Sequence, residues 1–107
     1  MRIDVIGLKF DVTEAIREYA ESKSQKLTRY FDRTQMITVR LSERDRRAGE
    51  YEVEIVADVE KHDNFVSTAS GDDLYLTIDS AVNKMSRQLT DFKEKLKLSS
   101  HHPDAPR

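Results

Sequence analysis

The stretch "EYEVEIVADVE", residues 50–60, decides the fold because apolar and acidic side chains alternate along it. One face would carry Tyr51, Val53, Ile55, Ala57 and Val59. The other face would carry Glu52, Glu54, Asp58 and Glu60, with Val56 between them. A period of two is typical of a β-strand with one buried and one solvated face. We therefore expect a sheet that needs an apolar partner on one side only.

Three shorter segments repeat this strand pattern. They are "RIDVIG" (residues 2–7), "QMITVRLS" (35–42) and "FVSTAS" (65–70). The polar segment "ERDRRAGE" (43–50) contains a glycine and suits a hairpin loop, and "HDN" (62–64) suits a turn. The chain is therefore predicted to contain four strands.

Two other segments change to the helical period. Over residues 13–31 apolar side chains recur at three- and four-residue steps, and Asp11 or Thr13 is placed to cap the helix. Over residues 72–98 seven apolar side chains follow one another at steps of three or four. Both segments are predicted to be amphipathic helices, each with one apolar stripe to bury.

The predicted order of elements is βαβββα. The helix between the first two strands predicts that they are parallel, with a right-handed crossover. A sheet with one apolar face can cover both helical stripes. We predict an α+β fold: a two-layer βαβββα sandwich, with a four-stranded mixed sheet and two helices on one face. Residues 1–98 would form this domain, and residues 99–107, which contain two prolines, a flexible C-terminal tail.

The composition excludes several classes of site. The 107-residue chain contains no cysteine, so disulfides and cysteine-based metal sites are excluded. His101 and His102 lie side by side in the tail without a third ligand, so we predict no metal site. Without a Gly-rich phosphate loop or a nucleophile motif, we expect no enzyme, no cofactor and no small-molecule substrate. No segment approaches the roughly 20 apolar residues that span a bilayer, and no signal peptide is recognisable, so we expect a cytoplasmic protein without a membrane partner.

Charge is distributed unevenly along a chain of formal net charge −2. Residues 50–63 contain six acidic side chains and one basic side chain, so the outer face of the sheet is expected to be negative. The ends of the two helices together hold nine basic and three acidic side chains. The basic residues are Lys23, Lys26, Arg29, Arg33, Lys84, Arg87, Lys93, Lys95 and Lys97. Clustered like charges repel one another, so this arrangement favours binding of a polyanion such as RNA.

Alternative interpretations remain open at this level. Any single lysine near a helix C-terminus is explained by a solvated face and the helix dipole. A general binder of double-stranded RNA would recognise any A-form duplex by shape. A protein-interaction module would use the acidic sheet face instead, and the 20 acidic side chains also guarantee chance carboxylate pairs that resemble an active site.

Two stretches of this chain resemble a known family. They are "VTEAIREYAESKSQKLTRYFDR" (12–33) and "DDLYLTIDSAVNKMSRQLTDFKEKLK" (72–97). They are similar to the short ribosome hibernation-promoting factors and to ribosome-associated inhibitor A, in the sigma-54 modulation protein (S30AE) family. The most specific parts are Tyr-Phe-Asp-Arg at 30–33, Asp-x-Tyr-x-x-Ile-Asp at 73–79 and Lys-x-x-Arg-Gln-Leu at 84–89.

The resemblance implies a fold related to the double-stranded-RNA-binding domain and a function in the bacterial cytoplasm. The protein would bind the 30S subunit and the 70S ribosome against 16S rRNA, in the channel for messenger and the A- and P-site tRNAs. It would inhibit translation by occupancy, in stress or stationary phase, and short members also promote inactive 70S dimers (100S). The alternative within the family is an inhibitor that stabilises 70S monomers without pairing them. The short, non-acidic tail is closer to the dimer-promoting type.

The resemblance also implies which residues face RNA. Matching positions are Lys23, Lys26, Lys84, Arg87, Gln88, Lys93, Lys95 and Lys97. Arg17 also matches, but it has acidic neighbours with which it would form ion pairs. Four further residues are basic without a clear family match, and with Arg17 they are peripheral candidates: Arg29, Arg44, Arg46 and Arg47.

Three positions need a separate interpretation. Asp91 stands where relatives carry a base, so it should weaken phosphate attraction or pair with Arg87 or Lys95. Tyr30 and Tyr75 are interpreted as core or core-edge residues rather than base-stacking platforms.

Overall fold

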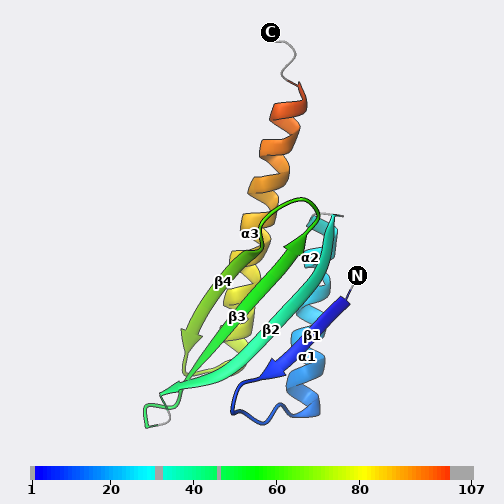
Figure 1. The fold of residues 1–107 in the computed structure, drawn as a ribbon. Helices are drawn as coiled ribbons and strands as arrows, with labels where there is room; N and C mark the ends of the chain where they lie inside the picture. The colour runs from blue at the N-terminus through cyan, green and yellow to red at the C-terminus, as the bar shows by residue number, and fades with distance from the viewer. Residues whose placement is uncertain (1, 31–32, 46, 102–107) are drawn as a thin grey trace.

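Four strands form one mixed sheet in the computed structural model, which describes residues 2–30, 33–45 and 47–101. The strands are β1 (Arg2–Gly7), β2 (Thr34–Asp45), β3 (Glu50–Val59) and β4 (Phe65–Gly71), and they lie side by side in this order (Figure 1). β1 pairs with β2 in parallel, whereas β2–β3 and β3–β4 are antiparallel. The predicted α+β class and the parallel first pair of strands are confirmed.

The helices cover one face of this sheet (Figure 1). They are α1 (Glu14–Gln25), α2 (Leu27–Tyr30) and α3 (Leu74–His101). Thr13 caps α1, because its Oγ1 accepts a hydrogen bond from the backbone N–H of Ile16 at 3.2 Å. α3 continues to His101, beyond the predicted end at residue 98, and residues 102–107 of the predicted tail lie outside the described part of the chain.

The first predicted helix is divided in two at Lys26, which corrects the single helix expected over residues 13–31. The N–H of Lys26 bonds to the Ser24 carbonyl, and the N–H of Arg29 bonds to the Lys26 carbonyl at 3.0 Å. The hydroxyl of Thr28 donates to the carbonyl of Gln25 at 2.8 Å. These short-range bonds replace the regular i→i−4 ladder and tighten the turn.

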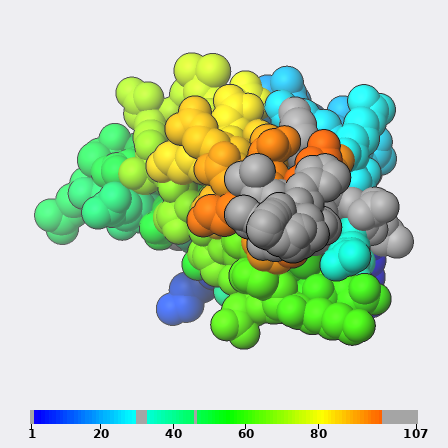
Figure 2. Space-filling model, turned by 90° about the horizontal axis from the view of Figure 1, so that it is seen from above, coloured from blue at the N-terminus to red at the C-terminus, as the bar shows by residue number. Residues whose placement is uncertain are grey.

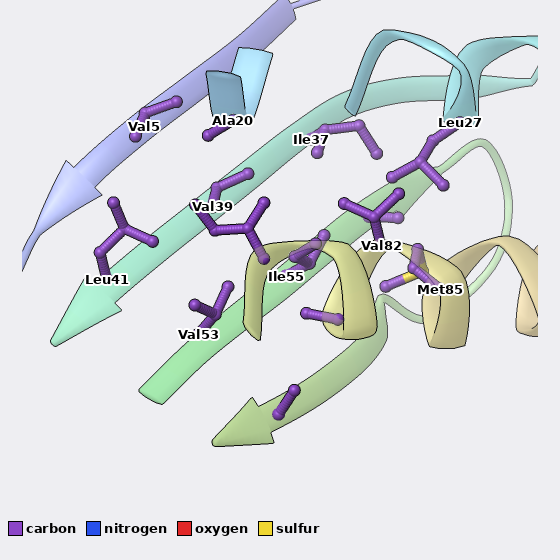
Figure 3. Close-up of a cluster of buried hydrophobic side chains, with 14 of the residues drawn as sticks. Val5, Ala20, Leu27, Ile37, Val39, Leu41, Val53, Ile55, Val82 and Met85 are labelled. Atoms are coloured by element: carbon purple, nitrogen blue, oxygen red, sulfur yellow. The ribbon is translucent and has the colours of Figure 1, made fainter. Parts of the chain in front are cut away.

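The core lies between the helices and the inner face of the sheet (Figure 3). The side chains of the central strands that alternate inward are fully buried, including Ile37, Val39 and Ile55. They pack against the stripe of α3, in which Val82 and Met85 are also fully buried. Burying an aliphatic side chain of this size contributes about 1.5–3 kcal/mol, so the layered core dominates the stability of the fold.

The β2–β3 hairpin is longer than predicted. β2 continues to Asp45 and β3 begins at Glu50, so the connection is shorter than the loop expected over residues 43–50. The carboxylate of Asp45 accepts hydrogen bonds from the backbone N–H groups of Arg47 at 3.0 Å and Ala48 at 3.3 Å. Gly49 has a φ of +64°, a conformation that disfavours residues with a Cβ.

α3 extends well beyond the sheet, past the β3–β4 turn (Figure 1). The molecule is accordingly elongated, with extents of 57 × 25 × 19 Å. On the projecting part, Phe92 and Leu96 remain partly buried against the core, while Lys93 and Lys95 are exposed. Within the described residues, no helix is both long enough and apolar enough to cross a membrane.

Candidate nucleic-acid interface

The C-terminal half of α1 lies beside the N-terminal third of α3, and the two helices run in the same direction (Figure 1). The hydroxyl of Tyr19 donates to Asp79 Oδ1 at 2.7 Å, and Lys23 Nζ lies 3.8 Å from the same oxygen. One turn further along both helices, Lys26 Nζ donates to Asn83 Oδ1 at 3.5 Å. The structure therefore brings Lys23 and Lys26 onto the surface that α3 carries.

Lys23 extends over the ring of Tyr19 and is not buried in the core. Its ammonium lies 5.5 Å from the centre of the Tyr19 ring, and its side chain is 41% exposed. The fully buried positions of this helix face are Ala20 and Ser24 instead. The hydrogen bond to Asp79, followed by desolvation and the charge of that carboxylate, raises the pKa of Tyr19 to about 12. Lys23 is thus partly neutralised by Asp79, which reduces its value as a phosphate contact.

Lys84 and Gln88 contact the free edge of the sheet. Lys84 Nζ donates to the carbonyl of Thr68, and Gln88 Nε2 donates to the carbonyl of Val66, both at 2.8 Å. β4 is an edge strand, and such strands leave backbone groups unpaired and open to another chain. These two candidates therefore cover the sheet edge, a role that the sequence pattern did not indicate, and Lys84 contacts no carboxylate among the described residues.

Five predicted RNA-facing cations have no carboxylate within 4 Å among the residues that the structure describes. We call them the cationic surface: Lys26, Lys84, Arg87, Lys93 and Lys95. At 3.6 residues per turn, Lys84 and Lys95 share the β4 flank of α3, Lys93 lies on the opposite flank with the exposed Lys97, and Arg87 points outward between the flanks. The charge therefore surrounds the exposed side of α3. In Figure 2 the described side chains of the projecting part of α3 (orange) lie between those of α2 (cyan) and those of the β3–β4 turn (green).

The peripheral candidates are not all brought to this surface. Arg17 does not form the expected ion pairs within the described chain; its Nη1 donates to the carbonyl of Val5 at 3.2 Å and ties α1 to β1. Arg29 is exposed on α2. Arg44 contacts Glu50 at 3.7 Å and Ser70 at 3.3 Å in the β2–β3 hairpin.

The hairpin arginines lie away from the cationic surface. The β2–β3 hairpin is at the opposite end of the sheet from the projecting part of α3 (Figure 1). Arg47 is exposed there, next to Arg44, and Arg46 lies outside the described residues. The sheet topology therefore separates these candidates from the helix ends, which the order of residues alone did not reveal.

The outer sheet face is mixed rather than uniformly negative, which corrects the sequence-based expectation. Arg40 pairs with Glu54 across β2 and β3 at 3.0 Å, and Arg2 pairs with Asp4 at 3.2 Å on β1. The expectation was based on the carboxylates of β3 alone. The folded sheet also carries arginines of β1 and β2 on this face. Exposed pairs of this kind contribute only about 0–1 kcal/mol to stability, but they lower the net field of the face.

The remaining side-chain predictions have three different outcomes. Tyr75 is 42% exposed and contacts Tyr19, which packs against the core, edge-on at 4.9 Å between ring centres; it is therefore a core-edge residue, one of the two predicted positions. The side chains of Tyr30 and of the two adjacent histidines in the tail lie outside the described part of the chain. Among described residues, no group of three His, Cys, Asp or Glu side chains is arranged to hold a metal ion.

Asp91 is exposed and makes no ion pair with Arg87 or Lys95 among the described residues. The pairing considered from the sequence is therefore not formed. The carboxylate instead lines a groove beside the β3–β4 turn, together with Gln88 and Lys95.

Comparison with known proteins places this arrangement in a family. The family profile described as Sigma 54 modulation protein / S30EA ribosomal protein matches residues 3–97. The "Ribosome hibernation promoting factor" of Escherichia coli strain K12 is 35% identical over 100 residues, which cover 91% of this chain and 98% of that protein.

Solved structures show the same fold. The "Thermus thermophilus Protein Y N-terminal domain" superposes with a TM-score of 0.73 and 33% identity, over 86% of this chain and 99% of that chain. A "ribosomal subunit interface protein from Coxiella burnetii" superposes with a TM-score of 0.78 and 23% identity, over 88% and 99%. With a family match over residues 3–97 and a shared topology, this chain belongs to the Sigma 54 modulation protein / S30EA ribosomal protein family.

Proposed function

We propose that this protein is a ribosome hibernation factor that occupies the messenger and tRNA channel of the small subunit. In that position it contacts 16S rRNA, excludes the A- and P-site tRNAs and inhibits translation without catalysing a reaction. The names of the relatives, which refer to ribosome hibernation and to the ribosomal subunit interface, support the partner. The observation that carries the proposal is the cationic surface, whose five charges have no carboxylate partner within the described chain.

The geometry suits an RNA channel. α3 projects beyond the sheet, so its cations can reach phosphates on more than one side without a clash from the body of the domain (Figure 1). Each phosphate that a cation neutralises releases condensed counterions, and this release supplies much of the affinity. Most of the arginines on the outer sheet face contact carboxylates, so that face competes weakly for the same RNA.

We further propose that the protein promotes inactive 70S dimers rather than stabilising monomers. The supporting observation is the match to the hibernation promoting factor of Escherichia coli, which extends over 98% of that protein's length. Sucrose-gradient sedimentation of 70S ribosomes with and without the pure protein tests both parts at once. We expect cosedimentation with 30S and 70S particles and a new 100S peak.

Two charge-reversed variants make the test specific. Arg87→Glu with Lys93→Glu changes two cations of the cationic surface that have no carboxylate partner among the described residues, and it spares Lys84, which covers the sheet edge. Arg2→Glu with Lys9→Glu makes the same change in net charge on exposed residues of β1 and the following loop. We expect the first variant to lose cosedimentation and the second to keep it. Retention of both variants on 70S particles would refute the RNA-facing assignment.

A further inference from the structure

A groove of about 310 Å³ lies where the β3–β4 turn meets the projecting part of α3. This volume is at the lower end of the roughly 300–1,000 Å³ typical of ligand sites. Its lining combines three aromatic rings with three polar side chains: His62, Phe65, Gln88, Asp91, Phe92 and Lys95. Nothing in the proposed phosphate contacts requires the aromatic rings, so the groove calls for its own explanation.

The aromatic rings form one continuous wall. His62 stacks on Phe65 with 4.6 Å between ring centres and 6° between planes, and it meets Phe92 at 4.4 Å and 61°. Phe65 and Phe92 lie 5.2 Å apart. Phe65 and Phe92 are partly buried, whereas His62 is exposed. An exposed ring backed by two fixed rings is a platform on which another flat ring can stack.

His62 is held in place before any ligand arrives. Its N–H bonds to the carbonyl of Val59 at 3.3 Å, and the preceding Lys61 adopts a φ of +60°. Its Nδ1 lies 2.6 Å from the carbonyl oxygen of Asp63, and since a carbonyl only accepts hydrogen bonds, Nδ1 carries the proton. A ring fixed in this way loses little conformational entropy when a ligand stacks on it.

The polar side chains of the groove can recognise the hydrogen-bonding edge of a base. Asp91 and Lys95 are separated by one helical turn but form no ion pair among the described residues, so both stay available. Gln88 is oriented by its hydrogen bond to the Val66 carbonyl. An ionised carboxylate is an acceptor only, and it can accept from two donors at once. Guanine alone among the common RNA bases presents two adjacent N–H donors, N1–H and the 2-amino group, on its Watson–Crick edge.

We infer that this groove holds one unpaired guanine of RNA. The base stacks on His62, its Watson–Crick edge faces Asp91, and Lys95 faces the adjacent phosphate. This inference rests on the proposed function, because single-stranded RNA with splayed bases is the partner that the cationic surface would present to the groove. In this arrangement Asp91, which lies beside the cations of the cationic surface, contributes to RNA binding instead of only repelling phosphates.

The test uses short RNA probes and the intact chain. The pentaribonucleotides UUGUU, UUAUU and UUUUU are titrated into isotope-labelled protein, and the ring resonances of His62 and Phe92 are followed by NMR. We expect UUGUU to bind about 5- to 150-fold more tightly than the other two, the range typical of one well-read base. Its binding should shift both rings. His62→Ala should weaken UUGUU binding by a factor in the same range, because stacking is lost.

A matched pair of variants isolates the carboxylate. Asp91→Asn should bring the affinities for UUGUU and UUUUU together, because an amide offers a donor where guanine also offers donors. Glu94→Gln removes the same charge from an exposed position of the same helix and should leave the guanine preference unchanged. Thermal unfolding of each variant confirms that it is folded.

Sedimentation with 70S particles, run in parallel, separates the two claims. Cosedimentation of the wild-type protein without any guanine preference, or with a preference that Asp91→Asn retains, refutes the base-binding groove and leaves the proposed function standing. If the wild-type protein does not cosediment with 70S particles, the proposed function is refuted. The inference about the groove rests on that function and is then left without ribosomal RNA as its partner.

Discussion

Replacing Arg87 and Lys93 with glutamine should flatten the salt dependence of ribosome binding. Both side chains are exposed on α3 and have no carboxylate partner within the described chain, so they are free to contact phosphates. Glutamine keeps much of the side-chain length and the helix propensity while it removes the charge. The change therefore tests charge alone, without the repulsion that a glutamate would add.

The cationic surface sets the expected magnitude. Each phosphate contact contributes about −0.7 to −0.9 to the slope of log K against log salt concentration. If all five cations contact phosphates, the slope is about −3.5 to −4.5, and raising salt from about 50 to about 200 mM lowers affinity by roughly 100- to 500-fold. Without Arg87 and Lys93 the slope becomes about −2.1 to −2.7, and the same change in salt costs about 20- to 40-fold.

Fluorescence anisotropy measures this slope directly. The chain contains no cysteine, so a single cysteine in place of the exposed Asp11 can carry a fluorophore. Labelled protein is titrated with 70S particles at several salt concentrations and constant magnesium. Arg2→Gln with Lys9→Gln is the control, and its slope should equal that of the wild type. Equal slopes for the wild type and the Arg87–Lys93 variant, or equal flattening in the control, would contradict the assignment of these cations to RNA.

The remaining predictions concern the fold that carries this surface. Tyr19→Phe should lower the free energy of unfolding by about 1 kcal/mol at neutral pH, because the hydrogen bond to Asp79 is lost. The pKa of Tyr19 is raised from 10.0 to about 12, so this stabilisation is complete below pH 10 and disappears as pH rises through 12, which urea unfolding of both proteins across that range measures. Leu89→Ala should cost about 2–5 kcal/mol in the same assay, since Leu89 is fully buried. Gly7→Ala should prevent normal folding or lower the melting temperature strongly, because a Cβ there would meet neighbouring backbone. Gly49 has open space around it but a φ of +64°, so Gly49→Ala should lower the free energy of unfolding by only about 1–2 kcal/mol. A circular-dichroism melt in which the two glycine variants are equally stable would contradict this ranking.

Only part of the arrangement of the interface candidates could be predicted from the sequence. A period of 3.6 residues places Arg87 outward and Lys93 on the flank opposite Lys95, and all three side chains are exposed in α3. The carbonyls that Lys84 and Gln88 contact belong to β4, and only the packing of the edge strand against α3 brings them within reach. The same holds for the groove, which needs the β3–β4 turn and α3 side by side.

What the amino-acid order determined by itself is the local structure: the strands with period two, the helices with period 3.6, and the parallel pairing imposed by a helix between two strands. The two periods depend on neighbours within one or two turns, so the pattern of apolar residues suffices to predict them. The parallel pairing follows from the helical crossover that joins the two strands. The tertiary structure alone decided which charges are neutralised. Lys23 meets Asp79 and Arg40 meets Glu54 because helix packing and strand register bring residues distant in sequence within 4 Å. An ion pair depends on the distance between two side chains in space, and that distance is defined only once the layers have packed together.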